Sequence, residues 1–232
     1  MFKKATIKDL LPPPVRAVHG EYSMIFSAAD ESSRASSELI RKSLAAIEAA
    51  LSIDFAELSQ RLASPPYFPE IWPGEHYKLL AGFSKTLQPA LIVEIGTATG
   101  LSALAMKAFA PGRMLTYDIV PWKEVPRTVL RESDFDETFV QVVGNLGDPV
   151  FFASQAILLR EAELIFIDAT HDGQLEKTLL AHLKTLPFKK APLVIFDDIR
   201  VWTMLKMWRE VSAPKLDLTS FGHWSGTGVV QM

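Results

Sequence analysis

The sequence predicts an α/β protein with a doubly wound, mostly parallel seven-stranded sheet, a C-terminal antiparallel hairpin strand and an N-terminal helical extension. Three observations lead to this fold class. Short apolar runs alternate with helical stretches between residues 91 and 212, as in strand–helix–strand units. A glycine-containing turn, Gly96–Gly100, joins the first run to an apolar helix. Two β-like runs around Gly222 and Gly226 end the chain and indicate a hairpin.

Length and charge restrict the function classes before any motif is considered. The chain has 232 residues, a net charge of −3 and a pI near 6.0, so no basic surface indicates nucleic acid or anionic membrane as a partner. It contains no cysteine, which excludes disulfides, thiolate zinc sites and cysteine nucleophiles. No secretory signal and no apolar run of about 20 residues are present, so we expect a cytoplasmic protein without a membrane span.

The first part of the chain, residues 1–66, is expected to be an irregular and helical extension of a domain that spans residues 67–232. Prolines at 12–14 prevent a helix near the N-terminus, and a helical pattern runs from Asp30 to Ala63. Asp30 and Ser32 are candidate N-caps of this helix. The residues expected to form its packing face are Ile40, Leu44, Ile47 and Leu51.

Within the domain, a helix is expected over residues 75–87, with His76 at the surface in its first turn. Further strands are predicted at 114–118, 139–143, 163–167 and 192–196, and further helices at 100–109, 149–160, 173–186 and 200–212. The closing runs, 215–221 and 227–232, would form the hairpin. This order is that of a Rossmann-like sheet, in which ligands bind at the carboxyl ends of the strands.

The turn after the first strand indicates the kind of ligand. Glu94, Gly96 and Gly100 do not match the three-glycine dinucleotide fingerprint or a phosphate-binding P-loop. The remaining match is the E-x-G-x-x-x-G pattern of S-adenosylmethionine (SAM) enzymes. Ser102 lies in the first turn of the next helix, where its hydroxyl either holds a carboxylate or caps the helix.

Polar residues follow the other strands as well. Asp118 lies 24 residues after Glu94, close to the interval at which an acid binds the ribose hydroxyls of a nucleotide cofactor. A solvated loop aspartate is the alternative. The segment Asn145–Asp148 follows the third strand and lies at the same edge of the predicted sheet.

Three acids, Asp168, Asp197 and Asp198, end the fourth and fifth strands. Neighbouring carboxylates repel one another unless a cation neutralises them, and oxygen ligands suit Mg²⁺. Asp197 and Asp198 can both bind it only if the chain turns between them. Alternatively, Asp198 caps a helix and Asp168 lines a cofactor pocket. His171 is either a proton acceptor for a substrate hydroxyl or a surface residue.

Three segments together resemble class I SAM-dependent methyltransferases. Val93–Ser102 resembles the first motif of that family, Leu164–His171 its fourth-strand motif and Val194–Ile199 its fifth-strand motif. The chain looks most like the small metal-dependent O-methyltransferases related to the catechol and caffeoyl-CoA enzymes, and like sugar O-methyltransferases with a paired-aspartate metal site. The resemblance covers residues 67–232.

The resemblance implies a residue set for each part of the site. Cofactor-binding residues would be Glu94, Gly96, Thr97, Gly100, Ser102, Asp118, Asn145, Leu146, Gly147, Asp148 and Asp168. Metal ligands would be Asp168, Asp197 and Asp198. His171, which stands where catechol-type members have a lysine base, and Asp168 would be catalytic. The paired aspartate is closer to the sugar-modifying branch.

The expected activity is SAM-dependent O-methylation of a small-molecule hydroxyl with the help of Mg²⁺ or another divalent cation, without a nucleic acid or membrane partner. A non-catalytic cofactor-binding or assembly protein and a NAD-dependent oxidoreductase are the alternatives. Aromatic residues could line an acceptor pocket, belong to the core or form a homodimer interface. These are Tyr67, Phe68, Trp72, Trp202 and Trp224.

Overall fold

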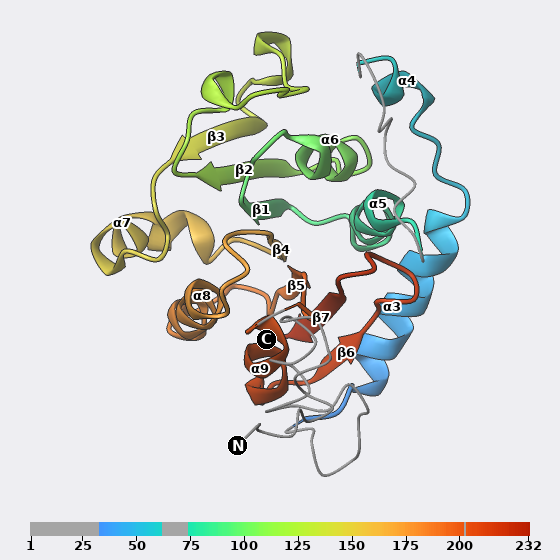
Figure 1. Ribbon diagram of the computed structural model, residues 1–232, viewed down its shortest axis with the longest axis vertical. Coiled ribbons are helices and arrows are strands. Elements are labelled where there is room, and N and C mark those ends of the chain that lie inside the picture. Colours follow the sequence, from blue (N-terminus) through green and yellow to red (C-terminus); the bar gives the residue numbers. More distant parts are fainter. Residues whose placement is uncertain (1–32, 62–73, 202) are drawn as a thin grey trace, which may run out of the picture.

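A seven-stranded sheet forms the centre of the molecule in a computed structural model that describes residues 33–61, 74–201 and 203–232 (Figure 1). The strands are β1 Leu91–Ile95, β2 Arg113–Asp118, β3 Phe139–Val143, β4 Leu164–Ile167, β5 Leu193–Asp197, β6 Lys215–Asp217 and β7 Thr227–Gln231. Their order is β3-β2-β1-β4-β5-β7-β6, and β7 runs antiparallel to both its neighbours, while the other pairs are parallel. The predicted doubly wound sheet with a C-terminal antiparallel hairpin is confirmed.

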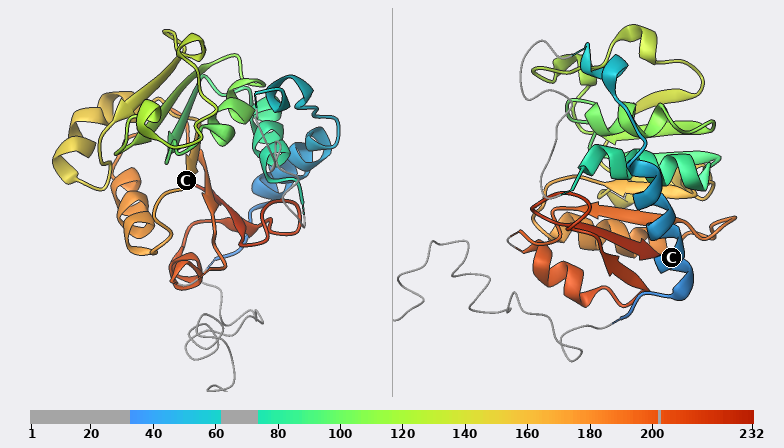
Figure 2. Two further views of the ribbon diagram at one scale, coloured as in Figure 1. Left: turned by 45° about the horizontal axis from the view of Figure 1, so that its top comes forward. Right: turned by 90° about the vertical axis from the view of Figure 1, so that its right-hand side faces the viewer.

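Helices cover both faces of this sheet (Figures 1 and 2). On one face lie α3 Ser37–Ala50, α5 His76–Leu87 and α6 Leu101–Lys107; on the other lie α7 Pro149–Leu159, α8 Gln174–Lys184 and α9 Met204–Glu210. Shorter helices are α4 Ala56–Ser59, η1 Trp122–Glu124 and η2 Glu132–Asp134. No helix in the described part of the chain has the length and apolar character needed to cross a membrane.

Two large apolar clusters, one on each face of the sheet, form most of the core, and a small third cluster contains Ile53 and Phe55. Val93 and Ile165 pack toward α7, α8 and α9, whereas Ile92 and Phe166 pack toward α3, α5 and α6. Successive side chains of a strand point to opposite faces, so every residue of the central strand β1 is buried. This explains why its sequence is a continuous apolar run, interrupted only by Glu94.

The packing face predicted for the first helix is wrong at three of its four residues. Ile40, Leu44 and Leu51 are 41%, 59% and 84% exposed, whereas Ile47 is partly buried and packs against the core. The buried residues of α3 are Leu39, Ser43 and Ala46. A Cβ on Gly82 of α5 would lie 2.2 Å from the carbonyl oxygen of Ala46, so the two helices meet closely at small residues. Small residues carry no apolar periodicity, and the sequence pattern therefore indicated the other side of the helix.

Some predicted bounds also differ. The helix expected over residues 30–63 begins at Ser37 and ends at Ala50. Its N-cap is Ser36. The predicted caps Asp30 and Ser32 lie outside the described residues. The hydroxyl of Ser36 accepts a hydrogen bond of 3.0 Å from the Leu39 N–H. The helix expected over 200–212 is shorter, and the strand expected over 215–221 has three residues.

Candidate functional site

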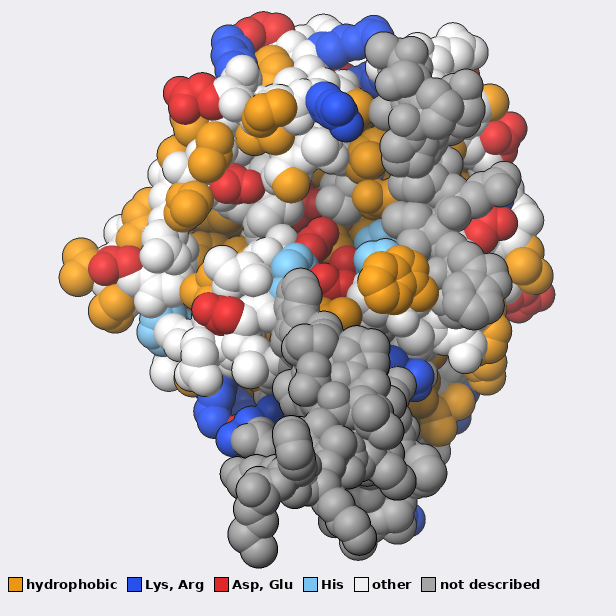
Figure 3. All heavy atoms as spheres, viewed as in Figure 1, with side chains coloured by type: hydrophobic (Ala, Val, Ile, Leu, Met, Phe, Trp, Pro, Cys, Tyr) orange, Lys and Arg blue, Asp and Glu red, His pale blue; other side chains and the backbone are white. Residues whose placement is uncertain are grey.

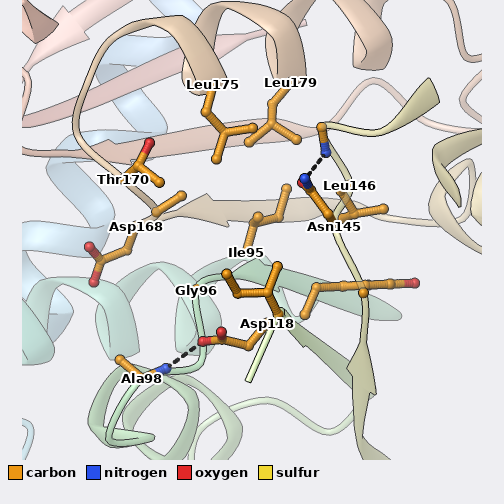
Figure 4. A pocket seen from close by; sticks show the side chains of 15 residues that line it. Ile95, Gly96, Ala98, Asp118, Asn145, Leu146, Asp168, Thr170, Leu175 and Leu179 are labelled. Carbon is orange, nitrogen blue, oxygen red and sulfur yellow. Dashed lines mark hydrogen bonds between the residues drawn. The ribbon is translucent and has the colours of Figure 1, made fainter. Parts of the chain in front are cut away.

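A cavity of about 270 Å³ opens at the carboxyl ends of β1, β2 and β4 (Figure 4). Strand order reverses between β1 and β4, which is where open α/β sheets bind ligands. Leu175 and Leu179 of α8 cover one side of it, and the turn after β1 lies opposite. The predicted cofactor residues that line the cavity are Gly96, Asp118, Asn145, Leu146, Gly147 and Asp168.

Asp118 holds the turn that forms the floor of the cavity. Its Oδ2 accepts a hydrogen bond of 3.0 Å from the backbone N–H of Ala98, and its Oδ1 accepts one of 3.0 Å from Val120 (Figure 4). Ala98 has a φ of +41°, a conformation that non-glycine residues adopt rarely. The carboxylate therefore supports a strained turn, and each of its oxygens keeps a lone pair for a further hydrogen bond.

Glu94 does not line the cavity, and its side chain is fully buried beneath the turn. Its carboxylate accepts a 2.6 Å hydrogen bond from Ser102 and a 2.5 Å hydrogen bond from Thr116. Thr116 in turn contacts Thr97 at 2.7 Å between their hydroxyl oxygens, and Gln141 donates to Thr97. The predicted cofactor residues Glu94, Thr97 and Ser102 thus form one buried hydrogen-bond network that fixes β1, β2 and α6 around the turn.

Burial raises the pKa of Glu94 to about 7, against the opposing effect of the hydrogen bonds from Ser102 and Thr116. Below pH 4.5, its ordinary pKa, this carboxyl group is neutral in both the folded and the unfolded protein. Above that pH it ionises first in the unfolded protein, and this lowers the free energy of unfolding. Wild-type stability should therefore fall by about 3 kcal/mol between pH 4.5 and pH 7 through this one group. Urea unfolding at a series of pH values should show a flatter profile for Glu94→Gln.

A matched control for this measurement is Glu48→Gln on the exposed side of α3. Glu48→Gln should keep the wild-type dependence of unfolding free energy on pH. If Glu94→Gln also kept it, Glu94 would not carry the raised pKa. In the variant the amide can donate to the Thr116 hydroxyl, which is then free to donate its own proton to Thr97, so the network is kept with one bond reversed.

Gly100 and Asp148 also lie outside the cavity lining. Gly100 precedes α6 with a φ of +87° and packs against Leu130. Asp148 is the N-cap of α7, and its Oδ1 accepts hydrogen bonds from Val150 and Phe151 at 2.9 and 2.8 Å. These contacts satisfy the cap and give Asp148 a local structural role.

Beside the cavity, Asp197, Asp198 and His223 form a compact group that we call the carboxylate–imidazole cluster. Asp198 has a φ of +59°, so the chain turns after β5 in the way required for both carboxylates to reach one place. His223 Nδ1 lies 3.5 Å from Oδ1 of each aspartate. One potential ligand atom from each of the three residues lies within 4.8 Å of the others, a spacing suitable for one metal ion.

The sequence reasoning missed His223, although the hairpin contains a signal for it. Asp197 at the end of β5 pairs with Thr227 at the start of the antiparallel β7. A strand that runs antiparallel to β5 must bring the loop before it to the carboxyl end of the sheet. His223 lies in that loop and also contacts the Ser225 hydroxyl at 2.6 Å.

His171 joins Asp168 to this cluster. Its Nε2 lies 3.3 Å from Asp168 Oδ1, and its Nδ1 lies 3.2 Å from Asp198 Oδ2. Its backbone has a φ of +56°, and its N–H donates to the buried carboxylate of Glu176 at 2.8 Å. Asp168, which lines the cavity, is therefore connected to the cluster through one imidazole.

The charges of the site are strongly coupled. Partial burial and the nearby carboxylates of Asp197 and Glu94 raise the pKa of Asp168 well above its ordinary value, although its side chain still lines the cavity. Although burial opposes it, the neighbouring carboxylates of Asp197 and Asp198 raise the pKa of His223 to about 9. Burial would raise the pKa of Asp198, but its polar neighbours His223 and Ser225 outweigh that effect and lower the pKa. Figure 3 shows acidic and histidine side chains together in a hollow of this face.

His76 is not at the surface, contrary to the sequence prediction. It is the first residue of α5, is 3% exposed, and packs against Tyr77, Phe166 and His223. Burial lowers its pKa and so favours the neutral imidazole. The sequence could not predict this burial from the place of His76 in the first turn of a helix. His76 is buried because α5 docks beside the end of β5.

The aromatic residues considered for the acceptor site are mostly not described. Tyr67, Phe68, Trp72 and Trp202 lie outside the described residues. Trp224 is 63% exposed, so it is not part of the core, and its ring centroid lies 5.5 Å from that of His223. An exposed indole therefore borders the carboxylate–imidazole cluster.

Solved structures share this fold at low sequence identity. The SAH-bound Podospora anserina methyltransferase PaMTH1 is 15% identical, with a TM-score of 0.52 over 82% of this chain and 88% of that chain. The Streptomyces achromogenes O-methyltransferase TomG, solved with SAM, is 16% identical, with a TM-score of 0.52 over 82% and 96% of the two chains. A Geobacter sulfurreducens methyltransferase is 19% identical, with a TM-score of 0.50 over 67% and 77%.

The chain spans 38% of the length of the MycE methyltransferase of the mycinamycin biosynthetic pathway, with a TM-score of 0.47 and 21% identity over 65% of this chain. No family model matches the sequence, and no curated protein does. The shared architecture is the fold of class I SAM-dependent methyltransferases. Function has to be argued from the site, because one fold hosts many functions.

Proposed function

We propose that this chain transfers the methyl group of SAM to a hydroxyl oxygen of a small molecule, with a divalent cation at the carboxylate–imidazole cluster. One observation carries the proposal: Asp168 lines the cavity and is linked through His171 to Asp198. The proposed cofactor site and the proposed cation site would thus be adjacent. An acceptor bound at the cluster would lie next to a cofactor bound in the cavity, as proximity catalysis requires.

The cavity residues fit the cofactor. Asp118 would accept hydrogen bonds from the ribose hydroxyls, and Asn145–Gly147 would border the adenine, beside the apolar Leu175. Gly96 would allow the backbone to approach the methionine part closely. The fold relatives PaMTH1 and TomG were solved with SAH and SAM, which supports this cofactor. SAM supplies a methyl group on a sulfonium, which becomes a neutral thioether when the acceptor oxygen takes the methyl carbon.

The cluster residues fit a cation and a proton acceptor. Asp197, Asp198 and His223 would hold the ion, with Asp168 nearby. When bound, a divalent ion lowers the pKa of an acceptor hydroxyl and fixes its position. His171 would take the hydroxyl proton, and the carboxylates beside its two ring nitrogens would stabilise the imidazolium.

The domain division follows the same proposal. Residues 67–232 would form the SAM-binding domain, and residues 1–66 would contribute to acceptor selection. Its support is the packing of α3 on α5, because α5 begins with His76 beside the cluster. The exposed Trp224 would offer an aromatic surface to the acceptor.

Titration calorimetry tests the proposed function without knowledge of the acceptor. Wild-type protein should bind SAM and SAH with one site per chain, and NAD should give no heat. The absence of SAM binding by protein with a cooperative unfolding transition would contradict the proposal. NAD binding in its place would favour the oxidoreductase alternative.

A further inference from the structure

His76 has a buried ring nitrogen without a hydrogen-bond partner among the described residues. Its side chain is 3% exposed, and the nearest carboxylate oxygen to Nδ1 is Asp197 Oδ1, 4.0 Å away. Asp197 Oδ1 and Asp198 Oδ1 are also buried and lack a hydrogen-bond partner. Unpaired buried polar atoms are rare in proteins, and such a group indicates that an ion or water belongs there.

The spacing of these atoms favours an ion. Distances of 3.5 Å from His223 Nδ1 to the two carboxylates and 4.0 Å from His76 Nδ1 to Asp197 exceed those of good hydrogen bonds. Two ligands that bind one ion at about 2.0–2.2 Å lie up to roughly 4 Å apart. The three elements that carry these residues, the start of α5, the end of β5 and the loop before β7, meet here.

An ion pair between His223 and the aspartates does not explain the whole arrangement. It accounts for the position of His223, whose ring lies between the two carboxylates and Ser225. It leaves His76 Nδ1 unpaired, although the His76 ring is only 5.4 Å from the His223 ring between centroids. Ligand atoms of Asp197, Asp198 and His223 lie within 4.8 Å of one another, and a small shift of the His76 ring from its place 4.0 Å from Asp197 Oδ1 would let one ion give both imidazoles and both carboxylates a partner.

We infer that His76 is a fourth ligand of the cation held by Asp197, Asp198 and His223, and that this site selects a first-row transition ion over Mg²⁺. Mg²⁺ prefers oxygen ligands and an octahedral shell with several waters. Imidazole nitrogen instead favours ions such as Zn²⁺ and Co²⁺, which bind two-histidine, two-carboxylate sets well. The inference rests on the proposed function for the role of the ion in methyl transfer, but the binding itself is independent of that role.

Cobalt titration of chelator-treated full-length protein tests the inference. Co²⁺ should bind one per chain and give visible absorption bands of a low-coordinate nitrogen- and oxygen-ligated ion. Zn²⁺ should displace it, whereas Mg²⁺ at roughly 1,000-fold excess should not. Displacement by Mg²⁺ at concentrations similar to those of Zn²⁺ would overturn the inference.

A variant pair tests the contribution of His76. His76→Phe fills the same space beside Phe166 and Tyr77 and should weaken Co²⁺ binding by at least about tenfold, with altered absorption bands. His182→Phe is the matched control. His182 lies on α8 and packs against Phe152, so its substitution should leave Co²⁺ binding unchanged. Unchanged affinity and spectrum in folded His76→Phe would show that His76 is not a ligand.

A measurement on wild-type protein covers the case in which His76→Phe does not fold. Electron spin echo modulation of the Cu²⁺-loaded protein should show two coupled imidazoles, and a single imidazole would overturn the inference. Calorimetry with SAM separates this result from the proposed function. SAM binding without transition-ion selectivity contradicts the metal inference alone, and selective Co²⁺ binding without SAM binding contradicts the proposed function alone.

Discussion

Asp118→Ala should weaken SAM binding by at least about 100-fold in titration calorimetry. The carboxylate is the acidic group at the end of β2 that lines the cavity, and two charge-assisted hydrogen bonds to ribose hydroxyls are worth about 3 kcal/mol or more together. The substitution also removes the acceptor for the Ala98 N–H, so the turn of the cavity floor loses its support. Both effects act in the same direction. Asp118→Asn, which keeps one acceptor oxygen, should lose roughly tenfold.

A control must separate the ribose contact from general damage to a turn. Asp136→Ala suits this purpose, because Asp136 also accepts backbone hydrogen bonds, from Thr138 and Phe139 at 2.7 and 2.9 Å. It precedes β3 and therefore lies at the amino ends of the strands, away from the cavity. Asp136→Ala should lose some stability and keep wild-type SAM affinity. Equal affinities of the two variants would contradict the assignment of Asp118.

The sequence was sufficient for the sheet and for residues whose position depends on a strand end. Each predicted strand is present, and the rule that ligands bind at carboxyl ends led to Gly96, Asp118 and Asp168, which line one cavity. Glu94 shows the limit of motif reasoning. It shares a face of β1 with Ile92, so alternation along the strand directs its side chain toward α6 and Ser102, not toward the cavity.

The two histidines that lie beside Asp197 could not be placed from local pattern. His223 reaches Asp197 through the antiparallel pairing of β5 with β7, and His76 reaches it through the docking of α5. That docking depends on close contact between Gly82 and Ala46, where small residues leave no periodic apolar signal. Local sequence therefore indicated the carboxylates of the site, and only tertiary packing placed the imidazoles of His76 and His223 beside them.

Gly96→Ala should be the most destabilising single substitution considered for the site. A Cβ at this position would lie 1.8 Å from the Asp168 carbonyl oxygen, and Gly96 has a φ of +105°. Neither β1 nor β4 can move away, because the Asp168 N–H donates to the Ile95 carbonyl at 2.9 Å and the strands pair along their length. Steric clash and backbone strain together should cost more than about 4 kcal/mol, seen as a fall in melting temperature of roughly 10 °C.

Gly147→Ala provides the comparison, because it tests whether any added methyl group at the cavity has this effect. Its Cβ would lie 2.5 Å from the end of the Leu175 side chain and 3.0 Å from Asn145 Oδ1, both atoms of side chains that can shift, and no positive φ is required there. Gly147→Ala should therefore cost about 1 kcal/mol or less. Similar melting temperatures for the two variants would show that the turn after β1 can relax. We expect a much lower melting temperature for Gly96→Ala than for Gly147→Ala. That result would mean that the close contact between the ends of β1 and β4 requires glycine at position 96 in the absence of any cofactor.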